Sequence, residues 1–224
     1  MGVAPTRVTR SSVLLAGRGR LHGERTREVP GTDHQEDPMR LAALAALVAS
    51  IAFALPAHAA GKFLLKSADV KAGATLTDQQ VFNGFGCSGA NVSPQLSWEN
   101  APAGSKSFVV TVYDPDAPTG SGWWHWVVYN IPAATTALAQ GAGSGTAPLP
   151  EGAAQGRTDF GAAGFGGACP PVGDKPHRYV FTVFALKVEK LEVAADASPA
   201  LVGFMTRANS LGSATFTATY GRKK

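Results

Sequence analysis

Residues 177–188 constrain the fold of this chain more than any other segment. Successive side chains of a β-strand point to opposite faces of a sheet. One set of alternate positions here includes Tyr179, Phe181 and Val183, and the other includes Val180 and Phe184, so both faces are largely apolar. A strand that is apolar on both faces is covered on both sides. The segment therefore predicts the central strand of a layered β domain.

Other short apolar runs, separated by Gly, Pro, Asn and Asp, extend this pattern and predict a mostly β fold. The predicted strands cover residues 63–66, 80–83, 95–98, 107–113, 124–130, 177–188 and 214–220. One or two short helices are expected near the C-terminus. One of them has Ser198 as its N-cap and Pro199 in its first turn, and it is expected to end near Leu211–Gly212.

The N-terminal part of the chain has the pattern of an export signal preceded by extra residues. A short basic head precedes an apolar run from Leu41 to Leu55 and a small-residue site that ends at Ala59. This order is typical of a signal peptide over residues 39–59, and it predicts a periplasmic or secreted protein. The apolar run is short for a stable membrane span, which needs about 20 residues. Residues 1–38 are interpreted as a mis-assigned translation start or a disordered extension.

Residues 60–224 are enough for a single domain with a sizeable core, but not comfortably for two domains. They carry 13 Lys and Arg against 11 Asp and Glu, so the formal charge of +4 for the full chain falls to +2. The basic residues form no stripe interleaved with aromatic ones, and Arg222-Lys223-Lys224 is interpreted as a solvated terminus. Nucleic acid is therefore not an expected partner.

Cys87 and Cys169 are the only cysteines of the chain, and both lie in this domain. An even number of cysteines in an exported protein favours a disulfide between them. A free or metal-bound pair is the alternative, although neither cysteine has the C-x-x-C partner that redox catalysis or structural zinc would use. No cofactor and no metal are expected.

A long stretch between Pro132 and Pro176 is dominated by Gly, Ala, Pro and Thr. A connection of this length without regular structure is usually either functional or disordered. Residues 157–160 interrupt the glycines with anchoring side chains, and a disulfide at Cys169 would tie the far end of the loop to the rest of the domain. The loop is therefore predicted to lie against the domain and to be functional. It lacks the glycine motifs of nucleotide-binding loops.

Chemically active side chains gather where two predicted strands meet. Asp114 and Asp116 follow one apolar run and His125 lies in the next, while His177 begins the predicted central strand. Polar groups pressed against aromatic strand ends cost free energy unless they are paired. The segment is therefore a candidate site rather than a plain turn.

The residue types alone leave several functions open. Such side chains can bind a divalent metal, perform acid–base hydrolysis with Ser121 or Ser210 as nucleophile, or bind a polar ligand. Alternatively, the aspartates form Asx turns and both histidines are satisfied core groups.

Four motifs occur in order along the chain: Ser93-Pro94-Gln95-Leu96-Ser97-Trp98, Tyr113-Asp114-Pro115-Asp116-Ala117-Pro118, the strand Trp123-Trp124-His125-Trp126, and Pro170-Pro171 followed by Gly173 and His177-Arg178-Tyr179-Val180-Phe181. Together they resemble the phosphatidylethanolamine-binding proteins, also called Raf kinase inhibitor-like proteins, and above all their bacterial branch. The resemblance extends from about Phe63 to Tyr220.

This resemblance implies a β domain of two antiparallel sheets, with a small pocket at the strand ends that binds phosphate or the phosphoryl head of a lipid. No catalytic residue is expected, because the site offers no evident nucleophile or oxyanion arrangement. Where eukaryotic relatives often have a second histidine, this chain has Trp124. Trp123 is the alternative to Trp124 at the pocket wall. By position, the ligand-binding residues would be Asp114, Asp116, Pro118, Trp124, His125, Pro171, His177 and Tyr179.

The leading expectation is an exported, non-catalytic module that binds a phosphate-bearing small molecule or lipid head group. His125 and His177 would contact the phosphate, and the aspartates would orient the histidines or pair with a ligand ammonium. Affinity for phosphate is then expected to rise as the pH falls from about 8 toward about 5.5, because histidine titrates near pH 6.5. The alternatives are a phosphoester hydrolase and a protease or kinase inhibitor. A protein partner and a homodimer stay open.

Overall fold

The computed structural model describes residues 61–224. The segments interpreted as an extended start (1–38) and as a signal peptide (39–59) lie outside the described residues. Within the described part, no helix is both long enough and apolar enough to cross a membrane.

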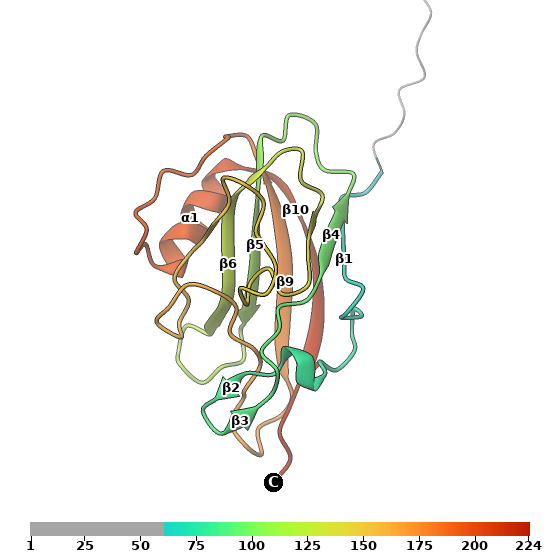
Figure 1. The fold of residues 1–224 in the computed structure, drawn as a ribbon, viewed down its shortest axis with the longest axis vertical. Coiled ribbons are helices and arrows are strands. Elements are labelled where there is room, and N and C mark those ends of the chain that lie inside the picture. The colour runs from blue at the N-terminus through green and yellow to red at the C-terminus, as the bar shows by residue number, and fades with distance from the viewer. Residues whose placement is uncertain (1–60) are drawn as a thin grey trace, which may run out of the picture. The chain divides into compact units, whose positions relative to one another are not determined.

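The main sheet has five strands in the order β10-β9-β5-β6-β8, and all neighbouring strands are antiparallel. The strands are β5 (Ser107–Asp114), β6 (Trp123–Pro132), β8 (Ala154–Gln155), β9 (His177–Leu186) and β10 (Ser210–Tyr220). The predicted central strand is confirmed, because β9 lies between β10 and β5 (Figure 1).

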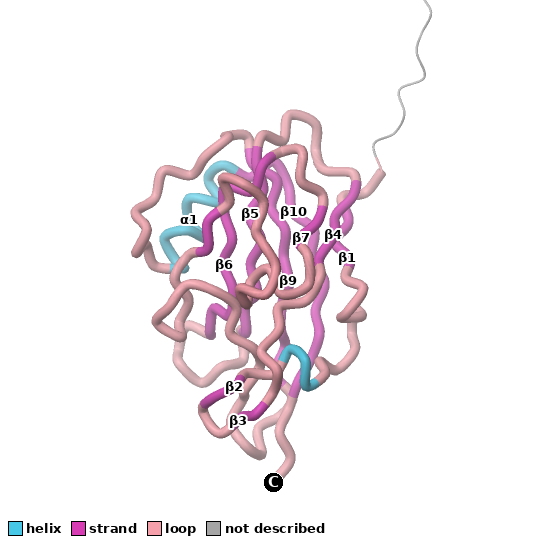
Figure 2. Tube along the Cα trace, in the orientation of Figure 1, coloured by secondary structure: helices cyan, strands magenta, loops and turns pink. Residues whose placement is uncertain are grey.

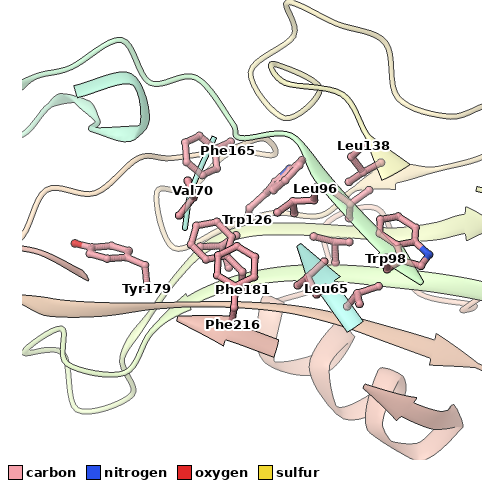
Figure 3. Packing of buried hydrophobic residues seen from close by; sticks show 14 of the residues in the cluster. Leu65, Val70, Leu96, Trp98, Trp126, Leu138, Phe165, Tyr179, Phe181 and Phe216 are labelled. Carbon is pink, nitrogen blue, oxygen red and sulfur yellow. The ribbon is translucent and has the colours of Figure 1, made fainter. Parts of the chain in front are cut away.

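A smaller sheet packs on one face of the main sheet. It has the order β1-β4-β7, with β1 (Leu64–Lys66), β4 (Leu96–Glu99) and β7 (Ala137–Leu138), and Figure 2 shows these strands on one side of the main sheet. Side chains from both sheets fill the space between them, among them Trp98, Trp126 and Phe181 (Figure 3). Each large apolar side chain buried in this way contributes about 1.5–3 kcal/mol to folding. The prediction of a mostly β domain with two antiparallel sheets is confirmed.

One α-helix occurs among the described residues, α1 (Pro199–Asn209), and it covers the opposite face of the main sheet (Figure 1). The hydroxyl of Ser198 accepts a hydrogen bond from the backbone N–H of Leu201 at 3.2 Å, as expected of the predicted N-cap. Val202 anchors the helix in a second apolar cluster with residues of β5 and β6. The helix ends before Leu211–Gly212, because these residues already belong to β10.

The prediction of a strand over residues 80–83 is wrong. A 3₁₀ turn, η1 (Asp78–Gln80), occupies its start, and the next strand is the short β2 (Asn83–Gly84). The hydroxyl of Thr77 donates to the side-chain oxygen of Gln80 at 3.0 Å. The backbone N–H of Gln80 donates to the carbonyl of Thr77 at 2.9 Å, which closes the 3₁₀ turn. Val81 and Phe82, which lie between these two elements, gave the sequence an apolar pattern that resembles a strand.

A disulfide fastens a small hairpin to the end of the glycine-rich loop. β2 pairs with β3 (Cys87–Ser88), and the two residues at the hairpin tip, Phe85 and Gly86, both have positive φ, 53° and 76°. Tight two-residue hairpins of one common type require this conformation at both positions. The predicted disulfide joins Cys87 to Cys169, and so holds the hairpin in place.

The glycine-rich loop packs against the body of the domain, as predicted. A Cβ at Gly143 would lie 2.6 Å from the ring of Trp126, so only glycine lets the loop approach this closely. Asn91 holds a later part of the loop. Its side chain accepts from the N–H of Gly167 at 2.7 Å and donates to the carbonyl of Phe165 at 3.3 Å. The loop is therefore held in a fixed position against the domain.

Candidate ligand pocket

A pocket of about 180 Å³ lies where three strands of the main sheet begin or end. Asp114 is the last residue of β5, Trp123 the first of β6 and His177 the first of β9, and strand pairing brings these ends together. The hairpin tip and the glycine-rich loop complete the walls. Of the residues predicted from the sequence, the lining contains Asp114, Pro118, His125, Pro171, His177 and Tyr179. The other two, Asp116 and Trp124, lie outside it.

A β-bulge in β6 directs His125 into this pocket. Val112 pairs with Trp126, and the next residue, Tyr113, pairs with Trp124, so His125 is the extra residue of the bulge. A bulge re-aims a side chain that regular alternation would send elsewhere. Here His125 lines the pocket while its neighbour Trp126 is buried between the two sheets.

Trp124 lies away from the pocket, contrary to the expectation from the resemblance, because strand alternation sends it to the face opposite His125. Trp124 packs in the cluster beneath α1, and its ring centroid lies 4.6 Å from that of Tyr113. The alternative residue, Trp123, lines the pocket. Regular alternation from Trp123 and His125, which both line the pocket, would also place Val127 on their face, but Val127 packs beneath α1 because His125 and Trp126 share one face at the bulge. Simple alternation fails at the extra residue.

A buried carboxylate orients His177. Oδ2 of Asp114 lies 2.7 Å from Nδ1 of His177, and each side chain is only 4% exposed. A carboxylate can only accept, so Nδ1 carries the hydrogen and donates. The other oxygen of Asp114 accepts from the backbone N–H of Asp116 at 2.8 Å, which is the Asx turn considered from the sequence. The geometry fits the orienting role expected of the aspartates.

Asp116 pairs with Arg178 instead of lining the pocket. Its carboxylate accepts from the guanidinium at 2.7 and 2.9 Å and from the backbone N–H of Arg178 at 2.8 Å. The side-chain hydrogen bond from Arg178 is the main reason that the pKa of Asp116 is held down at about 2. The carboxylate therefore stays charged and ties the loop after β5 to β9.

His125 is buried and bound to the glycine-rich loop. Its Nδ1 donates to the carbonyl of Gly166 at 2.7 Å, which leaves Nε2 as the free ring nitrogen. Burial lowers the pKa of His125, and the bond to Gly166 opposes this only in part. The ring is therefore neutral at pH 7, and its Nε2 accepts hydrogen bonds. The expectation of an imidazolium at His125 is corrected to a neutral ring.

Tyr179 carries an unpaired hydroxyl into the pocket. The residue is 1% exposed, and its hydroxyl has no hydrogen-bond partner in the described part of the chain. Three buried side-chain atoms lack a partner among residues 61–224, and this is the one that belongs to the pocket lining. In Figure 3 the hydroxyl points away from the other labelled side chains. Burial first, and then the charge of Asp114, raise the pKa of Tyr179, so the hydroxyl remains a donor.

Aromatic side chains form the rim of the pocket. Phe85 stacks on Phe160, with ring centroids 5.9 Å apart and planes 13° apart, and Trp123 meets Phe160 edge-on at 5.4 Å. Phe85 is 71% exposed although it lines the pocket. Phe85 and Phe160 were missed as pocket residues in the sequence. The available signals were the place of Phe85 close to Cys87 and the place of Phe160 among the anchors of the loop.

The two serines considered as nucleophiles lie outside the pocket lining. Ser121 belongs to the loop before β6, where its carbonyl accepts from the hydroxyl of Tyr113 at 2.7 Å. Ser210 begins β10, directly after the end of α1. Within residues 61–224, no group of three or more His, Cys, Asp or Glu side chains is placed to hold a metal ion.

Sequence comparisons agree with this two-sheet β domain. A family model described as phosphatidylethanolamine-binding protein matches residues 66–221. The protein YbcL of Escherichia coli strain K12 is 55% identical over 184 residues, which are 81% of this chain and 98% of YbcL. YbhB of the same strain is 56% identical over 156 residues, 70% of this chain and 98% of YbhB.

Solved structures support the same assignment. The crystal structure of E. coli YbcL, described as a new member of the mammalian PEBP family, matches with a TM-score of 0.70 and 58% identity over 72% of this chain and 99% of that one. A putative phosphatidylethanolamine-binding protein homologue from Chlamydia trachomatis, CT736, matches with a TM-score of 0.60 and 29% identity over 71% and 97%. The fold thus defines a β-sandwich domain with a pocket at its strand ends. The chain belongs to the phosphatidylethanolamine-binding protein family.

Proposed function

We propose that this protein is an exported, non-catalytic module whose pocket binds phosphate or the phosphorylated head group of a small molecule or lipid. The observation that carries the proposal is the buried hydroxyl of Tyr179 in the pocket, which has no hydrogen-bond partner among residues 61–224. Leaving such a donor without a partner costs about 1–3 kcal/mol. A ligand oxygen that accepts from this hydroxyl would remove the cost.

The groups that line the pocket suit a phosphoryl group that carries a proton. Tyr179 offers a donor, and Nε2 of the neutral His125 offers an acceptor. Among the described lining residues there is no Lys or Arg to offset the carboxylate of Asp114. A fully ionised phosphate would be repelled by this carboxylate, whereas a protonated one can accept from Tyr179 and donate to His125.

The expected pH dependence of binding keeps its direction under this proposal, but the titrating group changes. Phosphate esters have a second pKa near about 6, so affinity should rise as the pH falls from about 8 to about 6. The ligand, and not His125, takes up the proton. Calorimetric titrations at the two pH values would test this, and equal or tighter binding at the higher pH would contradict it.

Calorimetric titration of inorganic phosphate also tests the pocket itself. Tyr179→Phe should weaken binding about tenfold or more, because a hydrogen bond to a charged group contributes about 1.5–3 kcal/mol. Tyr129→Phe is the matched control, since Tyr129 belongs to the cluster beneath α1 and its hydroxyl should not affect binding. A wild-type protein that binds neither phosphate nor phosphoethanolamine would contradict the proposal. Turnover of generic phosphoesters would support the hydrolase instead.

Export forms part of the proposal, and it rests on the sequence. The match to YbcL covers 81% of this chain, whereas residues 61–224 make up less than three quarters of it, so the alignment extends into the segment interpreted as a signal peptide. Mass spectrometry of protein recovered from the periplasm should give an N-terminus directly after Ala59. A protein that retains the apolar run would contradict cleavage. A protein partner and a homodimer stay predictions.

A further inference from the structure

Asp174 lies beside the second ring nitrogen of His177. Its Oδ2 is 3.5 Å from Nε2, while Asp114 lies 2.7 Å from Nδ1 on the other side of the ring. The side chain of His177 is 4% exposed and that of Asp174 is 45% exposed. The three side chains therefore form a series that runs from the buried pocket toward the surface.

The position of Asp174 matters because Nδ1 of His177 is already occupied. Nε2 is the ring nitrogen that His177 has left for a ligand anion, and it donates to an anion when the ring carries a hydrogen on both nitrogens. Asp174 places a carboxylate at this nitrogen. A phosphate that approached Nε2 would meet a like charge at short range, and the two anions would repel each other.

On the side away from His177, Asp174 borders a cluster of basic residues. It lines an open cleft of about 610 Å³ together with residues 222–224, an arginine followed by two lysines. The N–H of Gly173 donates to the carbonyl of Arg222 at 2.9 Å, which fixes the loop backbone beside these residues. The half-exposed side chain of Asp174 lies outside the pocket lining. It therefore has His177 on one side and shares its cleft with cationic residues on the other.

We propose that Asp174 is a specificity-determining gate for anions in this pocket. In the structure its carboxylate lies at Nε2 of His177, where it competes with phosphate, and a bound phosphoryl group displaces it toward residues 222–224. This inference rests on the proposed function of the pocket. A ligand with an ammonium group is opposed less strongly than inorganic phosphate, because Asp174 attracts the ammonium group.

Titration of inorganic phosphate into Asp174→Asn at low ionic strength tests the gate. The variant should bind phosphate about tenfold more tightly than wild type, because one like charge near the anion is removed. The gain should shrink at high salt, since Asp174 is partly exposed to solvent. Asp196→Asn is the matched control, because it removes the same charge from an exposed turn before α1 and should leave affinity unchanged. The same substitution should raise the affinity for phosphoethanolamine less than the affinity for phosphate.

A double-mutant cycle tests the exchange of partners. Replacing both Lys223 and Lys224 by Gln should weaken phosphate binding several-fold when Asp174 is present, because the displaced carboxylate loses its alternative partners. The same replacement should have a smaller effect in Asp174→Asn. Equal effects in the two backgrounds would show that the lysines act by long-range attraction alone, and would overturn the exchange.

The outcomes separate the gate from the proposed function. If Asp174→Asn binds phosphate no more tightly than Asp196→Asn, the gate is wrong and the proposed function stands. If neither wild type nor Asp174→Asn binds phosphate or phosphoethanolamine, both are wrong, because the variant lacks the competing carboxylate. Binding by Asp174→Asn with little or none by wild type would support the gate.

Discussion

Strand β9 joins two regions of the molecule that use one face of the main sheet in different ways. In the core region, Phe181 stacks on Phe216 with ring centroids 4.8 Å apart, and Val183 is fully buried between the sheets. In the pocket region, the hydroxyl of Tyr179 has no partner within the described part of the chain, and His177 is held by a buried carboxylate. The core region therefore stabilises the fold by apolar burial, while the pocket region keeps polar groups that the fold alone does not require.

Removing a side chain from the core region should have the largest effect on stability. Phe181→Ala is expected to lower the free energy of unfolding by about 3–5 kcal/mol, because it deletes a buried ring and leaves a cavity. Urea denaturation monitored by tryptophan fluorescence would measure the change. A loss below about 1 kcal/mol would mean that the core can repack around the gap, and it would weaken the contrast between the two regions.

The disulfide joins two segments of the pocket wall, the hairpin and the end of the glycine-rich loop, and its loss should have the next largest effect on stability. Replacing both Cys87 and Cys169 by Ser should lower the free energy of unfolding by about 2–4 kcal/mol, since the bond closes a long loop. Phosphate affinity should fall as well, because the disulfide holds the hairpin that carries Phe85 at the pocket rim. Unchanged phosphate affinity in the double variant would show that the hairpin is not needed for binding.

His125 should make the fold less stable in mild acid. Burial lowers its pKa in the folded state, whereas the unfolded chain has a pKa near about 6.5, so the unfolded state binds the proton first. His125 therefore does not reduce the free energy of unfolding above about pH 6.5. Below this pH the free energy of unfolding falls by at most about 1.4 kcal/mol per pH unit. His125→Gln should flatten this slope between about pH 6.5 and 5. An unchanged slope would contradict the buried neutral ring.

Asp116→Asn should have the smallest effect on the free energy of unfolding. Partly exposed ion pairs contribute about 0.2–1 kcal/mol, and the pair with Arg178 is of this kind. The folded pKa of Asp116 is lowered to about 2, so its contribution is present above the unfolded pKa of about 3.9 and is lost as the pH falls toward 2. Thermal unfolding at several pH values would show the difference vanishing in acid. Phosphate binding should be unchanged, and a tenfold loss would place Asp116 in the pocket.

Much of the fold could be predicted because its long strands have regular patterns. Residues 177–188 predicted the central strand β9, and Ser198 with Pro199 predicted the start of α1. The short segment at residues 80–83 could not be assigned correctly, because a local backbone hydrogen bond from Gln80 to Thr77 forms a 3₁₀ turn at its start.

Pocket residues that belong to a sequence motif could be predicted. Residues that only tertiary contacts bring to the pocket were missed. His177 and Tyr179 come from one motif and lie in the pocket as expected. Trp124 was expected in the pocket from its place in a motif, but it lies on the face of β6 opposite His125 and packs beneath α1. Asp174 reaches His177 through the path of its loop, which the pattern of apolar and polar residues does not encode.

The unfolding free energy of Tyr179→Phe in phosphate-free buffer tests the central claim most directly. The claim is that the Tyr179 hydroxyl contributes to ligand binding and does not stabilise the fold. The variant should be as stable as wild type or more stable, by up to about 1–3 kcal/mol, because it removes a buried donor that has no partner in the described residues. A loss of stability above about 1 kcal/mol would show that the hydroxyl supports the fold, and it would contradict the account.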